Sequence, residues 1–279
     1  MITIYNLKVI KCGNRIEIYK FNNYIVREQG QKEEFYRFVD NDKKEKPSKS
    51  EKSKEEEKII NKIDNLNRSR NKIVRLIKCN SDMKTFITLT FKKELDYKES
   101  KKCLNNMFNK LRRKYKNLKY IWVLEYGENG TKRLHYHLLC NIPINIKLSN
   151  SRTRKSEEHK ALENEFKIKF WNNLGFVDIR ELEQEDNTNI ALYVSSYIVK
   201  GLSKRELEGY RVFGYSKKTL LKPIIETKMD KRKISEILED YKDYISSYSN
   251  SYSIGYMRNG DFKGGTVIYI DLEKERINE

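Results

Sequence analysis

The chain has 279 residues, which suits one domain with extensions or two small domains. Hydrophobic residues make up 38% and charged residues 35%, so a core is possible, and no stretch has the apolar length of a membrane span or of a signal peptide. The net charge of +18 is spread along the chain and indicates a polyanionic partner, by default a nucleic acid.

Residues 1–55 are expected to hold N-terminal strands and a charged linker. Alternating apolar and polar residues predict strands at 2–10 and 14–21, with a weaker candidate at 34–39. Residues 40–58 carry almost no apolar side chain, which is typical of a solvated linker or of the exposed start of a helix.

Residues 56–215 show the clearest patterns and are expected to form one domain. Helices are predicted at 56–78, around 104–115, at 157–173 with Gly175 ending it, and at 189–202 with Gly201 ending it. Strands are predicted at 85–91, 119–127, 134–142 and 176–182, the middle two forming a hairpin. The order predicts an α+β fold with a central antiparallel sheet that carries helices on one face.

Residues 216–279 are expected to form a C-terminal extension. The segment 235–252 begins with helical spacing and then becomes rich in serine and tyrosine, and a closing hairpin is predicted around the sequence RNGD at 258–261.

Two of the three histidines in the chain, His135 and His137, lie two residues apart in the stretch KRLHYHLLCN. Residues at this spacing point to the same side of a strand, so the two imidazoles are expected side by side. Such a pair can grip a divalent cation.

A third ligand is expected from the partner strand of the hairpin. Glu125 lies beside the histidines if its side chain shares their face, and Glu128, at the turn, is a weaker candidate. Two imidazoles and a carboxylate suit Mn²⁺ or Mg²⁺ with open positions for substrate oxygens, and zinc is an alternative.

The stretch YVSSYIVKG places Tyr193, Tyr197 and Lys200 along one face of the last predicted helix. A phenol is a poor nucleophile at its usual pKa of about 10, but a nearby cation makes its ionisation easier. Taken alone, this helix is equally well an ordinary amphipathic one in a chain with 19 tyrosines.

The order of these motifs resembles that of the HUH endonucleases, the rolling-circle replication initiators of phages and plasmids. FITLTF is similar to their first motif, HYHLL to their histidine motif, and YVSSYIVK to their tyrosine helix. The likeness extends over roughly residues 60–215 and includes YRVFGYSK at 210–217, whereas Ser196 stands where many relatives carry a basic residue. It implies a sheet like that of the RNA-recognition fold, with a metal site and a nucleophile facing each other across it.

The resemblance implies a metal-dependent endonuclease and strand transferase that nicks single-stranded origin DNA. His135, His137 and Glu125 would hold Mn²⁺ or Mg²⁺, and Tyr197 would attack the scissile phosphate, leaving a 5′ phosphotyrosine link and a 3′ hydroxyl that primes synthesis. Lys200 would assist the tyrosine or stabilise phosphate charge, and its closeness to Tyr197 favours that residue over Tyr193 for the first cut. Tyr193 would make a second cut or serve only a structural purpose.

The implied partners are single-stranded origin DNA, a host helicase and a polymerase, since the chain contains no P-loop motif of its own. The location is expected to be the cytoplasm of a bacterial host, because the four scattered cysteines form no CxxC pair and no disulfide framework. The alternatives are a non-catalytic module that binds single-stranded nucleic acid, and a transposase or relaxase with the same chemistry. A relaxase usually has its tyrosine ahead of the histidines, and a single-tyrosine transposase is shorter.

Overall fold

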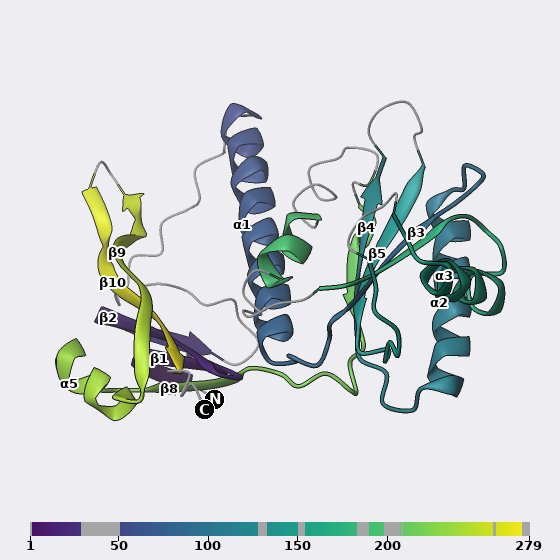
Figure 1. Ribbon diagram of the computed structural model, residues 1–279. Helices are drawn as coiled ribbons and strands as arrows, with labels where there is room; N and C mark the ends of the chain where they lie inside the picture. The colour runs from purple at the N-terminus through teal and green to yellow at the C-terminus, as the bar shows by residue number, and fades with distance from the viewer. Residues whose placement is uncertain are drawn as a thin grey trace. The chain divides into compact units, whose positions relative to one another are not determined.

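The computed structural model describes residues 2–28, 51–127, 133–149, 154–182, 190–197, 207, 209–258 and 261–274. The chain divides into two compact units (Figure 1). One unit combines the two ends of the chain, Met1–Lys49 and Lys222–Glu279, and the other is Ser50–Leu221. The α+β class is confirmed, with two antiparallel sheets.

The described part of the 50–221 unit contains a sheet in the order β6-β3-β5-β4-β7, and all neighbouring strands run antiparallel. The histidine strand β5 is therefore central, between β3 and β4. The strands are β3 (Thr85–Thr90), β4 (Tyr120–Tyr126), β5 (Leu134–Cys140), β6 (Val177–Glu181) and β7 (Phe213–Tyr215).

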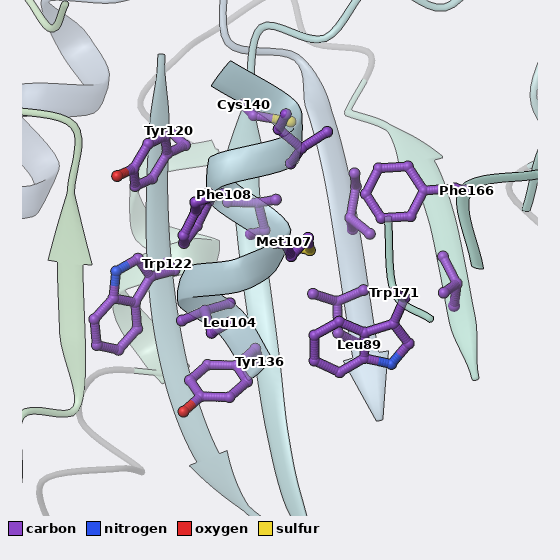
Figure 2. Close-up of a cluster of buried hydrophobic side chains, with 14 of the residues drawn as sticks. Leu89, Leu104, Met107, Phe108, Tyr120, Trp122, Tyr136, Cys140, Phe166 and Trp171 are labelled. Atoms are coloured by element: carbon purple, nitrogen blue, oxygen red, sulfur yellow. The ribbon is translucent and has the colours of Figure 1, made fainter. Parts of the chain in front are cut away.

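One face of this sheet is covered by helices α2 (Tyr97–Lys114) and α3 (Glu157–Lys169). Figure 2 shows side chains of α2, among them Leu104 and Met107, lying against aromatic residues of the strands such as Trp122 and Tyr136. The amphipathic spacing of α2 supplies this apolar side, and a capping box at Asp96 and Glu99 fixes where the helix begins.

The other face is also covered, so the prediction of helices on one face only was wrong. Helix α1 (Glu51–Lys78) and the helical residues 190–197 pack against it. The reason is visible in the near-continuous apolar runs of β4 and β5, which are typical of strands buried on both faces. The residues of this second core are Ile73, Leu76, Ile77, Met83, Phe86, Ile121, Val123, Leu139, Ile190, Ala191, Val194 and Leu220.

Helix α3 ends at Lys169, earlier than predicted, and Gly175 is not its cap. The chain turns at Asn172 and Asn173, which adopt the positive φ angles of 51° and 55° that asparagine tolerates. Gly175 is required by a close approach instead, because a Cβ there would lie 1.8 Å from the carbonyl oxygen of Thr90. The segment after α3 thus lies directly against the end of β3.

The terminal unit is built on a sheet in the order β8-β1-β2-β10-β9. The first and last segments of the chain, expected as separate extensions, are neighbours in it, since β2 pairs with β10. The hairpin predicted around RNGD is confirmed, but most of the predicted helix at 235–252 is a strand. The elements are β1 (Ile2–Cys12), β2 (Arg15–Glu28), β8 (Ile224–Lys228), α5 (Ile234–Leu238), the 3₁₀ turn η2 (Glu239–Tyr241), β9 (Tyr244–Arg258) and β10 (Asp261–Lys274). None of the described helices has the length and apolar character needed to cross a membrane.

Candidate active site

Strand register places the predicted metal ligands on one face of the sheet. Glu125 lies directly opposite His135 on the neighbouring strand, and His137 is two residues further along β5. On the other side of β5, Thr88 pairs with His137 and Thr90 with His135. Directly paired residues of an antiparallel ladder project to the same side. The hairpin prediction for this face is therefore confirmed.

His137 is the centre of the hydrogen bonding in this group. Its Nε2 lies 2.7 Å from Oε2 of Glu125, and its Nδ1 lies 3.2 Å from Oγ1 of Thr88. The imidazole is only 6% exposed. A buried ring with a carboxylate at one nitrogen and a hydroxyl at the other has a fixed orientation, which is the usual condition of a histidine that serves as a ligand or in acid–base chemistry.

His135 shares the face but is held less tightly. Burial lowers its pKa below the usual 6.5, and the neighbouring His137 lowers it further, while Glu125 acts in the opposite direction. A neutral imidazole at pH 7 is the form that binds a metal. Among the described residues, however, no three His, Cys, Asp or Glu side chains gather as a metal-binding group. The pair Glu125–His137 is assembled, and His135 is near it without closing on the same point.

The tyrosine helix lies over His137. Apolar residues at 190, 191 and 194 anchor it in the second core, which leaves Tyr193 and Tyr197 on an adjoining side. The ring of Tyr197 stacks on the imidazole of His137 with centroids 4.0 Å apart and planes inclined by 30°. The hydroxyls of Tyr193 and Tyr197 are hydrogen bonded at 2.7 Å. The two candidate nucleophiles therefore lie together, and one of them contacts a candidate ligand.

Two residues of the site had no role in the sequence prediction. Thr88 orients His137, and the buried ring of Phe86 lies beneath the group, with centroids 5.4 Å from Tyr193 and 5.7 Å from His137. The alternating pattern of FITLTF placed both on the sheet face, but only the register showed which histidine the threonine meets. Lys200 and Glu128 lie outside the described residues.

The Glu125–His137 pair fits a cation chemically. Two ligand atoms about 2.1 Å from a metal and at right angles to each other are ~3 Å apart, close to the observed 2.7 Å between Nε2 and Oε2. A nitrogen and a carboxylate oxygen facing each other must share a proton or a cation, because their lone pairs otherwise repel. Oxygen and imidazole ligands suit Mn²⁺, Mg²⁺ or Zn²⁺.

Comparison with known proteins gives one match. Residues 84–202 match a family model of replication-associated proteins, described by its ORF2 members. The matched segment contains β3, both histidines, Glu125 and the tyrosine helix. This match indicates a role in the initiation of replication. No curated protein and no solved structure gives a significant match.

Proposed function

We propose that the 50–221 unit is an HUH-type endonuclease, which nicks single-stranded origin DNA through a tyrosine and so initiates rolling-circle replication. The observation that carries this proposal is the contact between Tyr197 and His137, whose Nε2 faces the carboxylate of Glu125. A nucleophile, a ligand pair and an orienting hydroxyl come from three strands and a helix that are remote in sequence. The family match covers the same residues and points to replication.

In this proposal Thr88 and Glu125 hold the imidazole of His137, and His135 completes the ligand set by turning toward the same point. A divalent cation bound there would polarise the scissile phosphate. Basic side chains bind the strand through its phosphates and hold one phosphorus within reach of the phenol of Tyr197.

The reaction exchanges one phosphoester bond for another. The phenol oxygen of Tyr197 forms a bond to phosphorus, and the bond from phosphorus to the 3′ oxygen breaks. The phenol loses its proton and the departing 3′ oxygen gains one, so no redox partner is needed. The product is a 5′ phosphotyrosine with a free 3′ hydroxyl, which a polymerase can extend.

Tyr193 is suited to the second cut. Its hydroxyl is 2.7 Å from that of Tyr197, so a strand bound at one phenol lies next to the other. Hydroxyl-to-hydroxyl hydrogen bonding also means that either phenol can pass its proton to the other before attack. A second attack by Tyr193 would release the first end and close a circle.

The test is incubation of the full chain with Mn²⁺ and labelled single-stranded DNA of its own replicon, followed by mass spectrometry of DNA-linked peptides. We expect the adduct at Tyr197, and its loss in Tyr197→Phe. The control is Tyr248→Phe, which removes the hydroxyl of an exposed tyrosine in the terminal unit. Binding without any cut or adduct in Mn²⁺ would instead favour a non-catalytic binding module. An adduct that persists in Tyr197→Phe at Tyr193 would reverse the order of the two tyrosines.

A further inference from the structure

A pocket of about 650 Å³ lies beside the edge strand β7 and is here called the β7 pocket. It is lined by residues of α2, of the turn that follows α2, of β4, and of the segment 211–219. Six of the lining side chains are cationic, and the described residues of the lining include no carboxylate. The cationic residues are Lys101, Arg112, Lys116, Arg211, Lys217 and Lys218.

The cations of the β7 pocket that have polar or aromatic contacts meet only neutral groups. Arg112 donates to the hydroxyl of Tyr120 at 2.5 Å. Arg211 donates to the backbone carbonyl of Phe213 at 2.9 Å. Lys101 lies over the indole of Trp122, with its Nζ 3.5 Å from the ring centroid. Within the described part of the chain, no ion pair neutralises any of the six, so their charge is directed at whatever enters the pocket.

This crowding has a measurable consequence. Burial, followed by the charge of Arg211, lowers the pKa of Lys101 to about 8 from its usual 10.5. The folded protein therefore holds a partly buried ammonium next to a guanidinium of like charge, an arrangement that weakens the fold. A bound anion would relieve the repulsion.

The floor of the pocket is built for close approach. Gly214 lies against Trp122, where a Cβ would come within 2.6 Å of the indole, so only glycine lets β7 lie this near. The turn at 217–219 is fixed by the hydroxyl of Thr219, which donates to the Leu118 carbonyl at 2.7 Å. Trp122 is only 5% exposed, so the pocket offers charge rather than a stacking surface for a base.

The β7 pocket and the tyrosine site lie on opposite faces of the same sheet. Trp122 and Glu125 are three residues apart on β4 and point to opposite sides, which corresponds to ~10 Å along the strand. From this geometry we infer that the β7 pocket binds phosphates of the same single strand, which passes around the β7 edge and is anchored there beside the segment that is cut. The inference rests on the proposed function for the identity of the strand, but not on cleavage.

The test compares two double variants that each remove two positive charges. Lys217→Gln with Lys218→Gln changes two exposed residues of the pocket, and Lys102→Gln with Arg113→Gln changes two exposed residues of α2 that do not line it. Affinity for a fluorescent 20-nucleotide oligo-dT is measured in EDTA at several salt concentrations. Two lost phosphate contacts reduce the salt slope by about 1.4, because each contributes roughly 0.7 for single strands, and this corresponds to about 25-fold weaker binding at 0.1 M salt.

We expect this loss in the pocket variant and less than a threefold change in the control. Equal losses in both variants would overturn the inference, since bulk charge would then explain them. A second arm titrates thymidine monophosphate. Saturable binding that the pocket variant loses, with unchanged affinity for oligo-dT, would show a free nucleotide as the ligand and would also overturn it. Because cleavage is not measured, a failure of the nicking assay leaves this result independent.

Discussion

The hydroxyl of Thr88 gives the sharpest prediction for the candidate active site. A hydroxyl both donates and accepts, so it can serve His137 in either tautomer. With the Nε2 proton directed at Glu125, Thr88 donates to Nδ1; when Nε2 is a metal ligand, Nδ1–H donates to Thr88. In Thr88→Val neither hydrogen bond forms, while the shape of the side chain is kept.

The magnitudes separate a structural role from a role in metal binding. The hydrogen bond is long, at 3.2 Å, and joins neutral groups, so its loss should reduce the free energy of unfolding by only roughly 0.5–1 kcal/mol. Loss of a group that orients a metal ligand typically weakens metal affinity about 10–100-fold, or ~1.4–2.8 kcal/mol. We therefore expect the affinity for Mn²⁺ to fall by more than the stability does.

The assay pairs calorimetric titration with Mn²⁺ and urea unfolding in EDTA for wild type, Thr88→Val and Thr88→Ser. The serine variant keeps the hydroxyl and should restore most of the affinity, although it loses a methyl group. The reasoning is refuted if the valine variant binds Mn²⁺ as tightly as wild type, or if serine and valine behave alike.

Three further predictions follow from the fold around the site. Gly175→Ala should destabilise the protein by about 2–4 kcal/mol in urea unfolding, because the new Cβ must displace backbone at Thr90; a loss under 1 kcal/mol would contradict this close approach. Lys101→Met should be more stable than wild type at pH 7. Since burial and a nearby guanidinium lower the pKa of Lys101 to about 8, the folded state binds fewer protons than the unfolded chain up to pH 10.5, so wild type should regain stability relative to the variant between pH 8 and 10.5; parallel pH profiles would argue against it. Tyr136→Phe should cost about 1 kcal/mol through loss of its hydrogen bond with Ser100 and leave nicking unchanged, because the side chain points away from the histidine face; a loss of nicking would contradict that orientation.

The sequence predicted the parts of the site that depend on local pattern and hairpin register. Alternation along β4 and β5 set the face of Glu125, His135 and His137, and the short connection set which strands pair. It could not show that Glu125 bonds the diagonal His137 rather than the directly opposite His135, since that choice depends on side-chain rotamers and on burial. The approach of the tyrosine helix to His137 is a tertiary contact with no local pattern.

The errors at the C-terminal end have a different cause. The segment 235–252 contains helical spacing and many serines, and only a short helix forms before β9 begins at Tyr244. Strand β9 pairs with β10 along almost its whole length, and β10 in turn pairs with β2 from the other end of the chain. Such non-local pairing overrides weak local preference, and a single sequence gives no indication of it.

A comparison of two buried histidines identifies the one suited to chemistry. His159 is fully buried, its Nδ1 accepts the Ser149 N–H at 3.2 Å, and its Nε2 is 2.9 Å from the carbonyl of Ile179. A backbone donor at one nitrogen and an acceptor at the other allow a single tautomer, with the proton on Nε2. His137 instead meets a hydroxyl and a carboxylate, and both of these partners accept either tautomer once a cation is present.

Nitrogen-15 NMR of histidine side chains tests this difference directly, with diamagnetic Mg²⁺ as the titrant to avoid line broadening. We expect His159 to keep its Nε2 proton throughout, and His137 to change from the Nε2–H to the Nδ1–H form as Mg²⁺ binds. Glu125→Gln should abolish the change, since an amide is a weak ligand, while His159 serves as the internal control. If His137 retains its Nε2 proton at saturating Mg²⁺, it is not a ligand, and the pair with Glu125 is then a buried structural contact.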